Sequence, residues 1–192
     1  MNKVLFVFLA LLVGMISSAW GQDLIFKSGF EDGEMMPNPV HITCTDGPNV
    51  SPVIGATGVV VLRCTLYNNL SLQFDLGLLH TTLYVVESGS VFPFRNARLR
   101  FVQSGYTVFA TSTCGNFSCF TFSQQGMTGM SPFTSQEFEV LADVLDVQPS
   151  EGRHYVFAVV SPSDVSGTTF PPGGVYTVGG TPAVGFEIVP RR

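Results

Sequence analysis

Alternation of apolar and polar residues is the strongest pattern in the chain, and it predicts β-strands. From residue 70 to residue 78 every second residue is Leu or Phe, and the residues between them are Ser, Gln, Asp and Gly. The same period of two recurs over residues 60–66, 98–101 and 184–188. Successive side chains of a strand point to opposite faces, so this pattern is typical of strands with one buried and one solvated face.

Shorter runs rich in β-branched and aromatic residues lie between these segments, at residues 82–86, 106–111, 117–122 and 154–160. Residues that favour turns separate the runs. Residues 57–192 are therefore predicted to form an all-β domain, an antiparallel sandwich of about eight to ten strands.

The segment 136–147 fits two kinds of element. As a strand it would bury every second residue from Phe138 to Val144, and as a helix it would bury Leu141 and Leu145 together with Phe138. Periodicity alone does not separate these alternatives. The strand is favoured because the neighbouring segments are strands and Val is frequent here.

Residues 1–21 are predicted to be a secretory signal peptide. Lys3 precedes an apolar run from Val4 to Ile16, and small residues stand at the −3 and −1 positions of a cut before Gln22. A cut after Ala19 also fits, and the alternative to cleavage is an anchor helix. The run is short for a membrane span, which needs about 20 apolar residues. We therefore expect a secreted, periplasmic or surface protein with no stable membrane span after cleavage.

Residues 22–56 hold many Gly and Pro residues and little periodicity, so they are predicted to form an extended arm or linker. Loss of Lys3 with the signal peptide leaves eight basic and fourteen acidic residues, a net charge of −6. A nucleic-acid partner is not expected, because a basic surface supplies most of that affinity. With 45% hydrophobic residues, the chain is not predicted to be disordered.

The four cysteines, Cys44, Cys64, Cys114 and Cys119, all follow the predicted cut. An even number in an exported chain favours two disulfides, for which three connectivities exist. Cys44–Cys64 and Cys114–Cys119 are favoured because these partners are near in sequence. A zinc site is the less favoured alternative, since no C-x-x-C is present.

Two stretches resemble known protein groups. Ile25-Phe26-Lys27-Ser28-Gly29-Phe30-Glu31 resembles the short "IF-x-x-GFE" segment that follows the signal peptide of many exported proteobacterial proteins. From Gly58 to Phe170, an "N-x-x-L" strand at Asn96 and an "xFxVxADV" strand at Glu137–Val144 are similar to immunoglobulin-like β-sandwich modules of bacterial cell-surface proteins. The resemblance implies a spacer, stalk or adhesive unit without catalytic residues. This sequence departs from the pattern of those modules because it has one copy and no obvious surface anchor, which does not favour a stalk role.

Sites for catalysis are weakly indicated. There is no G-x-S-x-G around Ser88-Gly89-Ser90, and His41, His80 and His154 each stand alone without a metal-ligand spacing. On a strand, Glu137 and Glu139 would share a face at a separation of roughly 6–7 Å, which suits glycoside hydrolysis. The favoured interpretation is that these carboxylates line the solvated side of the strand.

No cofactor is predicted. Calcium is the inorganic ion that the oxygen-rich segments 30–34 and 45–49 would suit best, although Asp-Gly is also a common turn dipeptide. For carbohydrate, Tyr67 and Tyr84 could form a platform if they faced outward on neighbouring strands.

Two apolar loops are candidate contact sites. One contains Phe92 and Phe94, and the other contains Met127, Met130 and Phe133. Apolar side chains in loops either cap the end of a sandwich or form a contact patch, and capping is favoured.

The resulting functional hypothesis is an exported, non-enzymatic interaction or structural module of the bacterial cell envelope or medium. Its unknown protein or glycan partner would be bound by loops at one end of the sandwich and by a sheet edge. A secreted carbohydrate-binding module is the alternative, and a glycan hydrolase using Glu137 and Glu139 is less favoured.

Overall fold

The computed structural model describes residues 39–45, 50–85, 92–146, 153–170 and 175–192. The chain divides into the units Met1–Met35 and Met36–Arg192, and all of the described residues lie in the second unit. The predicted signal peptide and the Phe26–Glu31 motif therefore lie outside the described residues. Within the described ranges, no helix has the length and apolar character that crossing a membrane requires.

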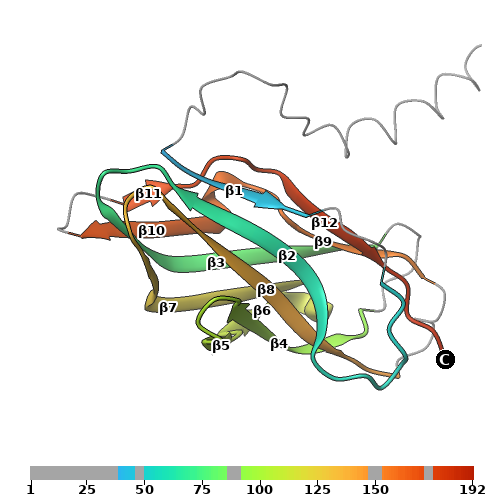
Figure 1. Cartoon of the computed structure of the whole chain (residues 1–192). Coiled ribbons are helices and arrows are strands. Elements are labelled where there is room, and N and C mark those ends of the chain that lie inside the picture. The colour runs from blue at the N-terminus through green and yellow to red at the C-terminus, as the bar shows by residue number, and fades with distance from the viewer. Residues whose placement is uncertain (1–38, 46–49, 86–91, 147–152, 171–174) are drawn as a thin grey trace, which may run out of the picture. The chain divides into compact units, whose positions relative to one another are not determined.

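Two antiparallel sheets form the fold (Figure 1). Sheet A has the strand order β1 (Val40–Cys44), β2 (Val59–Asn68), β8 (Thr134–Val144), β4 (Phe94–Phe101) and β5 (Thr107–Phe109). Sheet B has the order β11 (Val175–Thr177), β10 (Val165–Phe170), β3 (Gln73–Val85), β7 (Cys119–Met130) and β6 (Ser112–Thr113). The second half of β3 pairs with β9 (Tyr155–Val159), which pairs with β12 (Ala183–Ile188). The short 3₁₀ helices are η1 (Gly115–Phe117) and η2 (Pro162–Asp164).

The predicted immunoglobulin-like, all-β sandwich is thus confirmed as a class. The described residues contain twelve strands, more than the eight to ten predicted, because β5, β6 and β11 have only two or three residues each. Segments this short carry too little alternation to be recognised in a sequence. Residues 136–144 of the ambiguous segment are a strand, as favoured, and form most of β8.

The alternation over residues 70–78 changes phase inside β3. Leu76 pairs with Thr128 of β7, but Leu78 pairs with Ser123, so four residues of β7 lie opposite one residue of β3, three more than in regular pairing. Against β10 the register shifts as well, because Gly77 is an extra residue of β3, and beyond this bulge Leu79, rather than Leu78, lies fully in the core.

The core between the sheets is built around an aromatic cluster. Phe94 of sheet A meets Tyr155 and Phe157 of sheet B edge to face, with ring centroids 5.3 and 5.2 Å apart. Phe120 of β7 stacks near Phe157 at 6.0 Å. All four rings are fully buried, so this cluster fastens one sheet to the other.

Part of the predicted arm belongs to the domain, which corrects the boundary at residue 56. Residues 40–44 form β1, and the N–H of Ile42 donates to the carbonyl of Gly179 at 2.9 Å. The N–H of Val50 donates to the carbonyl of Glu187 at 2.9 Å, alongside β12. The arm prediction was wrong here because the strand is short and its Gly- and Pro-rich surroundings hide it.

Both favoured disulfides are present. Cys44 and Cys64 are cross-strand partners that join β1 to β2, with Cα atoms 3.9 Å apart. Cys114 and Cys119 close a short loop before β7, with Cα atoms 5.0 Å apart. Two disulfides are typical of proteins that fold in an oxidising compartment.

Candidate functional site

The two tyrosines proposed for a carbohydrate platform lie in different sheets. Tyr67 is on β2 of sheet A, where its ring stacks on His41 of β1 with centroids 4.5 Å apart. Tyr84 is on β3 of sheet B, and the structure describes its backbone but not its side chain. The expectation of neighbouring strands is therefore wrong, because β2 and β3 are joined across the two layers of the sandwich and do not pair.

Phe92 and Phe94, the described residues of the first apolar loop that were proposed as contacts, pack on the core. Phe94 is fully buried and begins β4, while Phe92 is half-buried. The guanidinium group of Arg95 donates to the carbonyl oxygens of both, at 2.6 and 2.7 Å, and lies 3.5 Å over the ring of Phe117. These contacts suit a cap that seals the core.

The second apolar loop is mostly strand. Met127 and Met130 belong to β7 and are buried, whereas Phe133, in the turn before β8, is 71% exposed. Phe94 pairs with Val144, at the other end of β8 from this turn. The two candidate loops therefore do not form one patch.

Charged side chains form a ladder across the outer face of sheet A. Arg63 of β2, Glu139 of β8 and Arg100 of β4 are direct cross-strand neighbours. The Glu139 carboxylate accepts hydrogen bonds from Arg63 Nη2 at 2.6 Å and Nε at 3.0 Å, and from Arg100 Nε at 3.1 Å and Nη2. Its side chain is only 6% exposed because the two guanidinium groups cover it.

This environment makes Glu139 a poor general acid. Burial by itself would raise the pKa of the Glu139 carboxyl, but the hydrogen bonds and charges of Arg100 and Arg63 outweigh burial and hold the pKa below its ordinary value. Asp143 is similar: burial opposes ionisation, yet the amide of Asn96, the Gly58 N–H and the charge of Arg98 lower its pKa. A glycosidase acid needs a raised pKa, so the ladder has the character of structural ion pairs.

Glu139→Gln is expected to lower the free energy of unfolding by about 2 kcal/mol, because charge-assisted hydrogen bonds to a covered carboxylate are lost. Both arginines reach solvent, so the cost stays below that of stranding a buried charge. Glu137→Gln, on an exposed residue of the same strand face, is the matched control and should be nearly neutral. Urea denaturation at pH 7 measures both.

The pH dependence of the free energy of unfolding is a second test of the Glu139 ion pairs. A carboxyl with a lowered folded-state pKa stabilises the fold above its unfolded pKa, and this contribution disappears as pH falls through the folded value. The gap between wild type and Glu139→Gln should therefore narrow on acidification below about pH 4. A gap that is constant with pH would contradict the ion-pair account.

A row of half-buried and exposed side chains continues from the ladder to the sheet edge. Arg98 pairs with Phe109 of β5, and Arg100 pairs with Thr107. Val102 follows on the same side of the strand, where its N–H donates to the carbonyl of Glu137 at 3.0 Å. Phe109 is 66% exposed. We call Arg98, Arg100, Val102, Thr107 and Phe109 the β4–β5 face.

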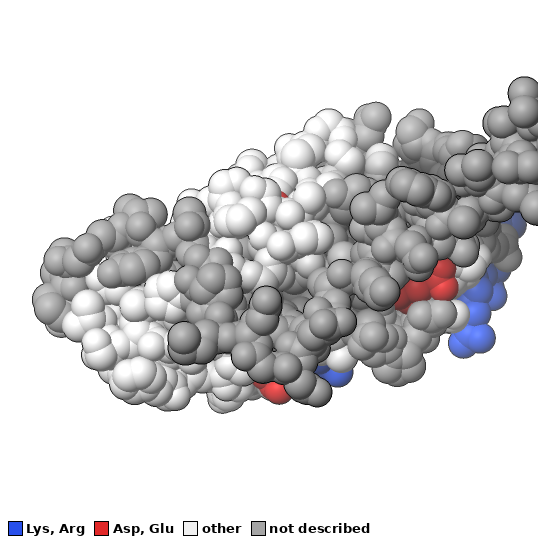
Figure 2. Space-filling model, turned by 90° about the horizontal axis from the view of Figure 1, so that it is seen from above, with Lys and Arg blue, Asp and Glu red and all other residues white. Residues whose placement is uncertain are grey.

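The distribution of charge sets this face apart. On the side of the domain seen in Figure 2, the described surface is largely uncharged, and most of the charged side chains in view lie at the lower edge and at the right. Arg63, Arg98 and Arg100, in contrast, lie together on the outer face of sheet A. The alternation of Arg98-Leu99-Arg100 indicates that both arginines share a face, but their acidic partners on β8 depend on register and have no local signal.

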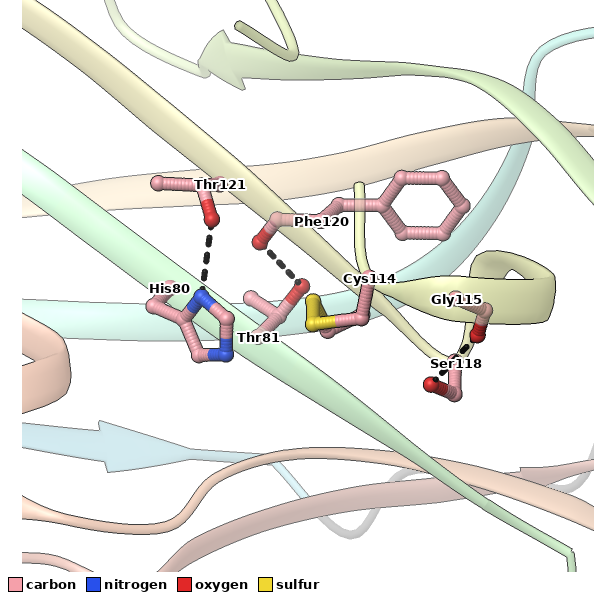
Figure 3. Close-up of a disulfide and its surroundings, with 8 residues drawn as sticks. His80, Thr81, Cys114, Gly115, Ser118, Phe120 and Thr121 are labelled. Atoms are coloured by element: carbon pink, nitrogen blue, oxygen red, sulfur yellow. Dashed lines mark hydrogen bonds between the residues drawn. A yellow bond between two sulfur atoms is a disulfide. The ribbon is translucent and has the colours of Figure 1, made fainter. Parts of the chain in front are cut away.

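The remaining candidate residues are distributed over the fold. His154 Nδ1 contacts Glu187 Oε1 at 2.5 Å, and His80 lies beside the Cys114–Cys119 disulfide (Figure 3). The loop with Ser88-Gly89-Ser90 and most of both candidate calcium segments lie outside the described residues.

Comparisons with known proteins identify no family. No protein-family model matches the chain, and no curated protein matches its sequence. AvmM, which catalyses macrocyclization in alchivemycin A biosynthesis, has 9% identity and a TM-score of 0.44 over 81% of this chain and 90% of its own.

Two further solved structures are more distant. ACE19, the collagen-binding subdomain of the Enterococcus faecalis surface protein ACE, has 8% identity and a TM-score of 0.32 over 81% of this chain and 99% of its own. PapD-like domain 7 of human CEP192 has 11% identity and a TM-score of 0.29 over 86% of this chain and 94% of its own. At these TM-scores the likenesses carry no argument about function.

Proposed function

We propose that this chain is an exported, non-enzymatic interaction module of the bacterial cell envelope or medium, and that it binds a protein partner through the β4–β5 face. The observation that carries the proposal is the exposure of Phe109 beside Arg98 on a regular strand pair. Aromatic and Arg side chains are enriched in protein interfaces, where they supply much of the binding free energy.

The chemistry of the face supports protein binding. Arg100 is held in place by Glu139, so little conformational entropy is lost when a partner contacts it. Phe109 and Val102 add apolar area on either side of the Arg100–Thr107 pair. A partner with an apolar anchor flanked by acidic groups would complement this arrangement.

Addition of a partner strand to a sheet edge is less favoured. The edge of β1 is hydrogen-bonded to Gly179, and residue 50 pairs alongside β12. The open edge of β5 belongs to a strand of only three residues, so an added strand would gain few backbone hydrogen bonds. The β4–β5 face is therefore preferred over the edge as the contact surface.

Site-specific crosslinking tests the proposal. A photoreactive phenylalanine analogue is placed at Phe109 in one variant and at Phe170 in another; Phe170 is 64% exposed on β10 of sheet B and serves as the matched control. Illumination of the producing cells should give a discrete protein adduct at position 109 only. The purified partner should then bind Phe109→Ala at least about 10-fold more weakly than wild type.

Three outcomes would overturn the proposal. Identical adducts at both positions would show non-specific contact, and unchanged affinity in Phe109→Ala would exclude the face. Turnover of a glycan substrate that is lost in Glu137→Gln would replace the non-enzymatic assignment with a hydrolase.

A further inference from the structure

The Cys114–Cys119 loop is held by more than its disulfide. Backbone pairing of β6 with β7 sets Thr113 opposite Phe120, immediately beside the two cysteines. The N–H of Cys114 donates to the carbonyl of Cys119 at 3.3 Å, and the N–H of Phe117 donates to the carbonyl of Cys114 at 3.0 Å. The two sulfur atoms would therefore stay near each other if the bond between them were broken.

A histidine from the neighbouring strand faces the same loop (Figure 3). His80 pairs with Thr121 across the sheet, and Cys119 is two residues from Thr121, so His80 and Cys119 share the outer face of sheet B. The Nδ1 atom of His80 lies 2.8 Å from Thr121 Oγ1, which fixes the orientation of the ring. One donor atom from each of His80, Cys114 and Cys119 lies within 4.8 Å of the other two.

We propose that reduction of the Cys114–Cys119 disulfide opens a zinc site made of the two thiolates and the His80 imidazole. Zinc bonds of about 2.3 Å to sulfur and about 2.0 Å to nitrogen place tetrahedral donors roughly 3.5–3.8 Å apart, a spacing that this cluster reaches with small side-chain movements. Cys114 is exposed, so water can take the fourth position. Thr121 is the positioning residue that holds the imidazole.

Formation of the zinc site takes two steps, reduction of the disulfide and then metal binding. A dithiol reductant transfers two electrons and two protons to the protein disulfide, which gives two cysteine thiols and the disulfide of the reductant. Zinc then displaces the proton of each thiol, so two protons are released and a neutral bis-thiolate zinc centre with one imidazole ligand is formed.

This disulfide suits reduction better than Cys44–Cys64. Each disulfide has one buried cysteine, Cys64 or Cys119, but Cys114 is exposed to a reductant whereas Cys44 is half-buried. Cys114 and Cys119 are 5 positions apart and Cys44 and Cys64 are 20 apart, and the shorter loop restricts the unfolded chain less. The sandwich should therefore keep its fold when only Cys114–Cys119 is open. The proposal does not depend on the protein-binding role.

The test uses the purified full chain with both disulfides formed. Mild anaerobic reduction by a phosphine, which takes up oxygen from water as the two thiols form, should free two thiols per chain and leave the circular dichroism unchanged. Titration against a chromophoric chelator should then show one zinc per reduced chain and none for the oxidised chain. His80→Ala should bind zinc at least about 100-fold more weakly, and Thr121→Val about 10-fold more weakly.

The controls keep the result decisive. His154→Ala removes a histidine elsewhere and should bind zinc like wild type. The double variant Cys114→Ser/Cys119→Ser retains Cys44–Cys64 and should bind none. The proposal is overturned by absence of zinc binding in the reduced wild type, by unfolding on reduction, by equal affinity in His80→Ala, or by binding that persists in the double serine variant.

Discussion

Phe157→Ala is expected to lower the free energy of unfolding by about 4 kcal/mol, the largest effect among the changes considered. Phe157 is fully buried in β9 and contacts Phe94 of the opposite sheet and Phe120 of its own sheet. Removing the ring loses its transfer free energy and leaves a cavity that rigid strands on both sides cannot close. Because the ring bridges the layers, the loss weakens the contact between the sheets.

Urea denaturation with both disulfides intact measures this loss. Phe170→Ala is the matched control, since Phe170 is also on a strand of sheet B but is exposed. Its free energy of unfolding should stay within about 0.5 kcal/mol of the wild-type value. If the free energy of unfolding of Phe157→Ala stays within about 1 kcal/mol of the wild-type value, the aromatic cluster is not the main contact between the layers.

The sequence predicted the strands of this fold well where one face is buried and the other is wet. The alternation over 62–66 and 98–101 is found in β2 and β4, whereas at the start of the predicted run a register shift puts Val61, rather than Val60, in the core. The prediction succeeds because a sheet with one buried face needs an apolar residue at every second position of each strand. Residues 136–144 also form a strand, since the position between β2 and β4 buries the face with Phe138, Val140 and Val144.

Features that depend on pairing between distant strands could not be predicted from this alternation. Nothing local to Glu139 indicates that Arg63 and Arg100 are its neighbours, because β8 lies between strands about 40 to 75 residues away in sequence. The approach of His80 to Cys119 depends likewise on the register of β3 with β7. Register is decided by the bulges and turns of the whole sheet, so spacing along the chain does not reveal it.

The contact residues proposed from composition show the same limit. Met127 and Phe133 look alike as apolar residues near Gly and Pro, yet one is buried in β7 and the other is exposed in a turn. Burial is a tertiary property, and a hydrophobic residue in a short apolar run is compatible with either outcome. The outward row on β4 was visible as alternation, but its meeting with Phe109 required the β4–β5 register.

Gly180→Ala is expected to lower the free energy of unfolding by about 3 kcal/mol, from two sources that can be separated. Gly180 has φ +84°, in the left-handed region that disfavours a side chain. A Cβ at this position would also overlap the backbone carbonyl oxygen of Ile42. The substitution therefore pushes β1 away from the segment that closes this side of the sandwich.

Gly55→Ala separates backbone strain from this collision. Gly55 has a similar φ of +92°, but a Cβ there would meet no atom within 4 Å. We expect Gly55→Ala to cost about 1 kcal/mol, the strain alone, and the difference between the two variants to report the contact of Gly180 with β1. Cys44–Cys64 keeps β1 attached to β2 in both variants, so unfolding remains measurable. Equal losses in the two variants would mean that β1 moves freely, and closure of the sandwich by β1 would then contribute little to its stability.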